Sequence, residues 1–266
     1  MPADDTAVRV VSLAPHLTEL AFEAGVGDRL VGVVAYSDTP PAATTLPQIG
    51  DAFRFDLERI VRLGATHALA WQGGTPAVAI RSLRELGLTV LEIGIERIDQ
   101  IPGALRRIGA LGGNPAIAEA RATAFESALA EMLEQRPDGP AIPVFYQVSE
   151  RPMFTLGRRH VINDVFRLCG ASNVFADLDT EAAAVGLESV LERKPLVLIL
   201  SEPGMEGFWT PQTTLRAVRC GHLMQVDPAV LVRPTPRLLE GARALCTWLD
   251  HHVRQAEDPA CRSGGD

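Results

Sequence analysis

Short runs of almost continuous apolar residues recur along the chain, separated by stretches in which apolar and charged residues follow helical spacing. Seven such runs occur, at residues 8–14, 30–35, 67–71, 90–94, 142–148, 196–201 and 223–227. Strands that helices cover on both faces have this composition. The stretches 18–24 and 82–86 show the helical pattern that lies between the runs. This order of elements predicts an α/β fold.

A long stretch in the middle of the chain has a different pattern. Residues 115–135 are rich in Ala, Glu, Leu and Arg, with no Gly and no Pro after the first position. Asn114 can cap a helix there, Pro115 suits its first position, and Pro137 marks its end. At about 1.5 Å per residue such a helix is roughly 30 Å long. We interpret it as a helix between two lobes; the alternative is a long surface helix of a single domain.

The sequence before this helix resembles the sequence after it. Residues 57–61 are Leu-Glu-Arg-Ile-Val and residues 187–191 are Leu-Glu-Ser-Val-Leu, and each segment precedes an apolar run. The repeat predicts two similar, Rossmann-like α/β lobes joined by a single long interdomain helix. The expected ranges are 9–103 for the first lobe, 104–140 for the connecting region, 141–254 for the second lobe and 255–266 for a flexible tail. A cleft between two lobes is a common place for a small-molecule site.

The charge balance of the chain limits its partners. The chain has 266 residues and a formal net charge of −8, with no cluster of Lys and Arg. A nucleic-acid partner is therefore not expected. No apolar run reaches the roughly 18 residues that a membrane-spanning helix needs. Met1 to Asp5 have neither the basic nor the apolar part of a secretory signal, so we expect either a cytosolic protein or a mature form with an added Met.

The residues that could carry chemistry do not form a catalytic pattern. The six His residues are dispersed without metal-ligand spacing, and the nucleophile-elbow, dinucleotide and phosphate-loop motifs are absent. The four cysteines include no C-x-x-C pair. They are either buried free thiols or disulfides, for which three pairings are possible. These observations predict a binding protein without a cofactor or a metal, and not an enzyme.

Two aromatic residues stand where ligands commonly bind. Aromatic residues make up only 5% of the chain, yet Tyr36 follows the run 30–35 and Trp71 ends the run 67–71. In α/β proteins the carboxyl ends of the strands face the crevice where ligands bind. The pair favours a flat apolar ligand over simple edge packing. Arg233 follows the last run and either faces the same cleft or is a solvated loop residue.

Several short motifs, in this order, carry a resemblance to a known family. They are residues 12–15 with 18–20, 36–38 with 40–41, 57–61, 70–74, 154–157, 169–170 with 173–175, and 236–237. From residue 9 to residue 252 the chain resembles the helical-backbone substrate-binding proteins of ABC importers, and most closely the periplasmic cobalamin-binding branch. The resemblance implies a class III periplasmic binding protein fold, a periplasmic location and a monomer. It also implies capture of cobalamin or a related corrinoid for delivery to the permease of an ABC transporter in the inner membrane.

The resemblance also assigns expected roles to individual residues. Tyr36, Trp71 and Phe154 look like aromatic contacts to the corrin. A second contacting segment is expected at Ala229, Val230, Leu231, Val232 and Arg233. Glu58 and Glu188 match the two acidic residues, one in each lobe, that dock on arginines of the permease.

The same glutamates also suit a purely structural role. A carboxylate in the first turn of a helix is favoured by the helix dipole, which explains the presence of either glutamate taken alone.

The resemblance pairs Cys169 with Cys246 in a disulfide, which implies an oxidising compartment. Cys220 and Cys261 have no such counterpart.

Some positions depart from the cobalamin-binding pattern. An aromatic residue expected before the first Leu-Glu helix is replaced by Ala52, with Phe53 and Phe55 as possible stand-ins. A second aromatic is replaced around Ala182, and an acidic residue is replaced by Ala229. The alternatives are therefore another corrinoid, or a haem or ferric-siderophore binding protein of the same fold. A cytosolic α/β enzyme is the alternative from another class, supported only by the lack of a signal sequence.

Overall fold

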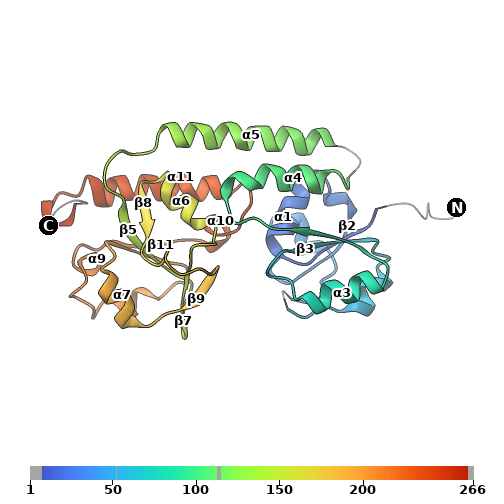
Figure 1. The fold of residues 1–266 in the computed structure, drawn as a ribbon, viewed down its shortest axis with the longest axis horizontal. Helices are drawn as coiled ribbons and strands as arrows, with labels where there is room; N and C mark the ends of the chain where they lie inside the picture. Colours follow the sequence, from blue (N-terminus) through green and yellow to red (C-terminus); the bar gives the residue numbers. More distant parts are fainter. Residues whose placement is uncertain (1–7, 52, 113–114, 263–266) are drawn as a thin grey trace. The chain divides into compact units, whose positions relative to one another are not determined.

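The computed structural model describes residues 8–51, 53–112 and 115–262, and the chain divides into two compact units (Figure 1). The first unit contains the described residues up to Ile95 together with Asp99–Ser127. The second contains Glu96–Ile98 and the described residues from Ala128 onward. The ranges predicted for two lobes and a connecting region stay a prediction.

The first unit is a parallel sheet covered by helices. Its elements are β1 (Val10–Ser12), α1 (Pro15–Glu23), β2 (Leu30–Val33), α2 (Leu57–Arg62), β3 (His67–Trp71), α3 (Ala77–Glu85), β4 (Thr89–Ile93) and α4 (Ile101–Gly109), with 3-10 turns at Gly27–Arg29 and Pro41–Thr45. The strand order is β2-β1-β3-β4, and all pairs are parallel. Figure 1 shows α3 on the face of this sheet opposite α1 and α4. Burial on both faces explains why β1, β2 and β3 read as apolar runs, whereas the edge strand β4 is only partly buried.

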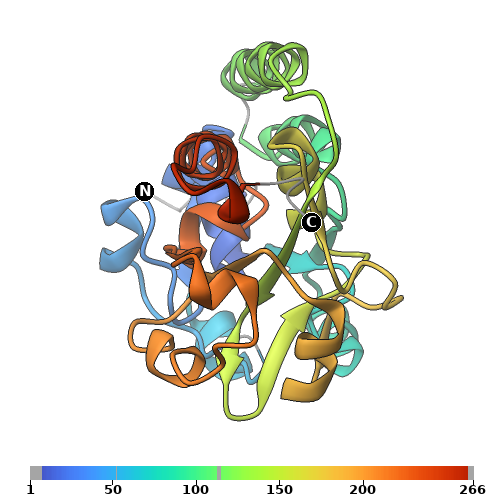
Figure 2. The same cartoon turned by 90° about the vertical axis from the view of Figure 1, so that its left-hand side faces the viewer.

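The second unit contains a similar parallel sheet and a small antiparallel one. Its elements are β5 (Ile142–Gln147), β6 (Ser149–Glu150), β7 (Met153–Leu156), α6 (Ile162–Leu168), β8 (Ala171–Asn173), β9 (Ala182–Ala184), α7 (Leu187–Arg193), β10 (Val197–Leu200), α8 (Glu206–Trp209), α9 (Arg216–Arg219), β11 (Leu223–Gln225), α10 (Pro228–Leu231) and α11 (Leu238–Leu249). The parallel sheet has the order β11-β10-β5-β8, and the antiparallel sheet has the order β6-β7-β9. Figure 2 shows the yellow-green hairpin of β6 and β7 extending beyond β5. Further turns lie at Ile98–Gln100, Asp250–Arg254 and Pro259–Cys261.

The predicted runs correspond to strands of the two parallel sheets. The run 67–71 is reproduced as β3, and the other six runs contain strands that are shorter or shifted by up to two residues at an end. The antiparallel strands were not predicted, because strands of two to four residues are too short for a periodic signal. The long helix is α5 (Pro115–Glu134). Asn114, its expected cap, lies outside the described residues.

The side chain of Arg106 attaches α5 to α4 within the first unit. Its guanidinium donates to Glu119 at 2.8 Å and to Glu126 at 2.6 Å. These hydrogen bonds raise the pKa of Arg106 and lower the pKa of each carboxyl below its usual range. Gly109 of α4 lies so close to α5 that an added Cβ would meet the Cβ of Ala118 at 2.2 Å. Close helix packing therefore requires a glycine at this position.

Two disulfide bonds cross-link segments of the second unit. Cys169 is bonded to Cys246, as the resemblance implies, and links the end of α6 to α11. A second bond joins Cys220 to Cys261, a pair that the sequence did not indicate. The alternative of free thiols is wrong, because the described residues include no free cysteine. The tail predicted to be flexible from residue 255 is thus tethered at Cys261, and residues 263–266 lie outside the described part of the chain.

The helices do not include a membrane-spanning segment in the part of the chain that the structure describes. Within residues 8–51, 53–112 and 115–262, no helix combines the length and the apolar character needed to cross a membrane.

Candidate functional site

In the first unit, the candidate ligand residues lie at the carboxyl ends of the strands. Tyr36 follows β2, Trp71 ends β3, and β1 lies between these two strands. The loop after β1 leads directly into α1, which begins at Pro15. The parallel topology thus gathers three loops at one edge of the sheet, which is where α/β proteins bind ligands.

Tyr36 has an unusual backbone conformation and an exposed side chain. Its φ is +64°, in the left-handed region, and its side chain is 81% exposed. The adjacent Ser37 is buried and hydrogen-bonded to Thr18 at 3.0 Å, and Thr18 in turn donates to Ser12 at 2.9 Å. This hydroxyl chain ties the Tyr36 loop to β1 and α1. Left-handed non-glycine residues held by their surroundings cluster at ligand-binding sites, which strengthens the assignment of Tyr36.

Trp71 is held in place by its neighbours. It is half-buried, and its indole meets the ring of His16 edge-to-face with the centroids 5.4 Å apart. Its backbone N–H donates to the hydroxyl of Thr75 at 2.9 Å. Gly74 packs against the indole so closely that an added Cβ would lie 2.0 Å from a ring carbon. The Gly73-Gly74 turn after the strand therefore gives the indole room to lie over the loop.

A hollow of about 620 Å³ adjoins Tyr36 in the same unit. The residues that line it are Ala35, Tyr36, Gln48, Gly50, Asp51, Arg54, Phe55 and Asp56. Asp51 organises the loop by accepting hydrogen bonds from the backbone N–H groups of Phe53 and Arg54, each at 2.8 Å. The bond from Phe53, followed by that from Arg54, lowers the pKa of the Asp51 carboxyl. Of the two stand-in aromatics, Phe55 lines the hollow with Tyr36, whereas Phe53 projects with 76% exposure; Ala52 lies outside the described residues.

In the second unit, Phe154 lies on the small antiparallel sheet. It is half-buried in β7, opposite Ser149 on β6 and Ala184 on β9. The neighbouring Thr155 is buried and donates to the carbonyl of Tyr146 at 2.8 Å, which fixes β7 against β5. The small side chains of β9 leave the ring of Phe154 partly uncovered. Phe154 therefore remains a candidate contact in this unit.

The segment 229–233 forms the short helix α10 and the turn after it. Asp227 caps this helix by accepting a hydrogen bond from the N–H of Ala229 at 2.8 Å. Leu231 is 1% exposed and packs in the core, and its expected ligand contact stays a prediction. Ala229, Val230, Val232 and Arg233 are half-buried, and they remain the candidates from this segment.

Three buried polar side chains near the end of β5 were not singled out from the sequence. Trp209 donates from Nε1 to Oε1 of Gln147 at 2.6 Å, and both side chains are buried. Tyr146 is 1% exposed, and burial raises the pKa of its hydroxyl, with the Asp227 carboxylate acting in the same direction. These residues lie inside a strand and a short helix, so no local signal separates them from core residues.

The two glutamates expected to dock on the permease are both exposed. Glu58 lies in the first turn of α2 and Glu188 in the first turn of α7. Asp56 caps α2 by accepting from the N–H of Arg59 at 2.8 Å, so Glu58 is not needed as the cap. Among the residues that the structure describes, neither glutamate is in an ion pair. Their exposure meets the first requirement for docking, and the docking role itself stays a prediction.

Comparison with known proteins places the chain in a class. Residues 10–213 match the family described as periplasmic binding protein. Because this match covers well over half of the chain, the chain belongs to the periplasmic binding protein family. Its two parallel sheets are those of the class III periplasmic binding proteins, and it is a binding protein rather than an enzyme.

Several similar proteins within this family are vitamin B12-binding proteins. The vitamin B12-binding protein of Vibrio cholerae serotype O1 is 35% identical over 246 residues, which cover 91% of this chain and 89% of that protein. The vitamin B12-binding protein of Pectobacterium atrosepticum is 33% identical over 251 residues, covering 91% of this chain and 88% of that protein. The crystal structure of the periplasmic vitamin B12 binding protein of Vibrio cholerae matches with a TM-score of 0.86 at 34% identity, over 92% of this chain and 97% of that one. A periplasmic heme-binding protein from Roseiflexus reaches 0.81 at 23% identity, over 92% and 99% of the two chains, a likeness that shows the fold alone.

Proposed function

We propose that this protein captures cobalamin or a related corrinoid and delivers it to the permease of an ABC transporter. The observation that carries the proposal is the 35% identity, over 91% of the chain, to a vitamin B12-binding protein. The contact residues that we propose are Tyr36 and Trp71 in the first unit, and Phe154 and Ala229, Val230, Val232 and Arg233 in the second. The permease is proposed as the partner from the family alone.

The chemistry of the candidate residues supports a large flat ligand. Tyr36 presents its ring to solvent, and an exposed aromatic face can pack on a corrin ring. Trp71 offers a second aromatic surface that its neighbours hold still. Arg233 can donate hydrogen bonds to the amide side chains of a corrin.

The number of accessible tyrosines argues against the haem or siderophore alternative. Only two tyrosines exist, Tyr36 and Tyr146, and Tyr146 is buried in β5. Burial holds the pKa of the Tyr146 hydroxyl well above its usual range, so it is neither accessible nor ionised as an iron ligand. A single exposed tyrosine supplies too few phenolic oxygens to coordinate ferric iron or to bind an anionic chelate.

A ligand panel tests this proposal directly. Isothermal titration of the full chain with cyanocobalamin, cobinamide, haemin and a ferric siderophore should show tight binding of a corrinoid and weak or no binding of the other two classes. Tight binding of haemin or the siderophore with no corrinoid binding would overturn it.

Charge reversal tests the proposed docking role. The double variant Glu58→Arg and Glu188→Arg should abolish corrinoid uptake while leaving corrinoid affinity unchanged, because carboxylates on two lobes can each pair with an arginine of the permease. A matched control reverses Glu131 and Glu134, which are exposed on α5. Normal uptake by the first variant would leave the two glutamates with the helix-dipole role alone.

A further inference from the structure

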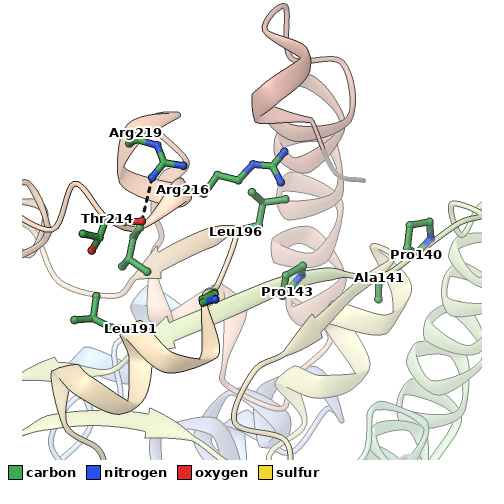
Figure 3. Close-up of a pocket in the computed structure, with 10 residues that line it drawn as sticks. Pro140, Ala141, Pro143, Leu191, Leu196, Thr214, Arg216 and Arg219 are labelled. Atoms are coloured by element: carbon green, nitrogen blue, oxygen red, sulfur yellow. Dashed lines mark hydrogen bonds between the residues drawn. The ribbon is translucent and has the colours of Figure 1, made fainter. Parts of the chain in front are cut away.

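A groove of about 570 Å³ lies in the second unit between α7, α9 and the beginning of β5 (Figure 3). The residues that line it are Pro140, Ala141, Pro143, Leu191, Lys194, Leu196, Thr214, Leu215, Arg216 and Arg219. None of the residues assigned to ligand binding contributes to it. The groove is therefore a separate feature of the surface.

The groove is apolar with a cationic rim. Lys194, Arg216 and Arg219 are its charged residues, and no acidic residue occurs among the described residues that line it. This local charge is opposite to the net charge of −8 of the whole chain. Leu191 and Leu196 contribute apolar surface to the groove. Such a surface fits a partner that is acidic and partly apolar.

Main-chain contacts hold the two arginines in place. Arg219 donates to the carbonyl of Thr214 at 3.0 Å, which Figure 3 shows as a dashed line, and Arg216 donates to the carbonyl of Arg262 at 2.5 Å. Arg262 follows Cys261, which is bonded to Cys220. The tethered tail therefore supplies the carbonyl that positions Arg216. A positioned cation loses less conformational entropy on binding than a mobile one.

The first unit has a related groove with a different charge. It has a volume of about 560 Å³ and is lined by Leu57, Glu58, Val61, Arg62, Ser82, Glu85 and Leu86. It lies between α2 and α3, with β3 between these helices in the sequence, and the other groove lies between α7 and α9, with β10 and α8 between them in the sequence. Two carboxylates and one arginine line this groove, in place of three cations.

Each groove adjoins one of the glutamates proposed for docking. Val61 follows Glu58 by three residues on α2, and Leu191 follows Glu188 by three residues on α7. Residues three apart on a helix share a face. Glu58 itself lines the groove of the first unit. The groove of the first unit thus includes its docking glutamate, and the groove of the second unit begins one helical turn after Glu188 on α7.

We propose that the cationic groove extends the docking surface that the proposed function requires and receives an acidic side chain, flanked by apolar residues, from the membrane subunit of the transporter. The proposal rests on the proposed function. A protein segment fits better than an anionic lipid surface, because the groove is recessed and a single side chain can enter it whereas a flat bilayer surface cannot.

The test reverses one rim charge that makes no fold-determining contact. Lys194→Glu in the full chain is compared with Arg243→Glu, an exposed cation on α11 outside the groove. Corrinoid-loaded protein is bound to its permease complex in nanodiscs of zwitterionic lipid at low and high salt. We expect Lys194→Glu to weaken the complex about five-fold at low salt and to reduce its salt dependence, with no effect of Arg243→Glu. Arg219→Gln, which removes a second cation without reversing it, should weaken the complex in the same direction.

The outcomes separate this proposal from the proposed function. Equal affinities for both charge reversals, or equal losses, would overturn the groove as a docking surface. If Lys194→Glu weakened binding to phosphatidylglycerol vesicles without the transporter but did not weaken binding to the permease complex, the groove would be a lipid contact. That result would also overturn the groove proposal. If the double reversal of Glu58 and Glu188 prevents docking while Lys194→Glu does not, the proposed function stands and the groove proposal fails. Failure of the wild-type chain to bind cyanocobalamin or cobinamide would refute the proposed function itself.

Discussion

Substitutions at Tyr36 should separate the cost of its backbone from the contribution of its ring. The residue has a φ of +64° and a side chain that is 81% exposed. Tyr36→Ala removes the ring and keeps the left-handed strain. Tyr36→Gly removes both. Comparing the two variants therefore isolates the backbone effect, and comparing Tyr36→Ala with the wild type isolates the contribution of the ring.

The magnitudes follow from the local geometry. A left-handed backbone costs a residue with a Cβ about 1–2 kcal/mol. Glycine avoids this cost but gains about 0.4–1 kcal/mol of conformational entropy in the unfolded chain. Tyr36→Gly should therefore be more stable than Tyr36→Ala by roughly 0.5–1 kcal/mol. Loss of the ring should weaken corrinoid binding about ten-fold in both variants, since one packed aromatic contributes on the order of 1.5 kcal/mol.

Two measurements check this reasoning. Urea unfolding followed by circular dichroism compares the stabilities, and titration with cyanocobalamin compares the affinities. Lys194, with a φ of +48° and no assigned ligand contact, provides the control: Lys194→Gly should stabilise the fold without changing affinity. Wild-type affinity in both Tyr36 variants would remove Tyr36 from the site. Equal stability of the Ala and Gly variants would show that the left-handed backbone is not strained.

Two further predictions concern stability. Replacing Cys169 and Cys246 by Ala opens a loop with a sequence separation of 77. Urea unfolding should show a loss of about 4 kcal/mol on chain-entropy grounds, and an unchanged midpoint would refute that account. Burial lowers the pKa of His160 from 6.5 to about 4. Since the unfolded chain then binds the proton more readily, stability should fall as the pH drops from 6.5 to about 4, by up to about 1.4 kcal/mol per pH unit. His160→Asn, which keeps an acceptor for the N–H of Ile162, should lose this part of the pH dependence, and an unchanged unfolding profile from pH 4 to pH 7 would contradict it.

The apolar pattern determined the elements that are buried on two faces. The strands of both parallel sheets follow from this pattern, whereas α5 followed from a stretch of helix-favouring residues between Pro115 and Pro137. The repeated Leu-Glu motif identified α2 and α7 as related helices, each with an exposed glutamate. The resemblance supplied the Cys169–Cys246 pair, which spacing alone left open.

The remaining features depend on contacts between residues that are far apart in the chain. The left-handed backbone of Tyr36 accompanies the hydrogen bond between Ser37 and Thr18, which are 19 residues apart. The Cys220–Cys261 bond brings the tail beside α9. Leu231 turns into the core because α11 packs against α10. The cationic groove gathers Lys194 from the end of α7 with Arg216 and Arg219 from α9. Local sequence patterns report the face that each element buries, but only the packed chain decides which side chains meet across elements.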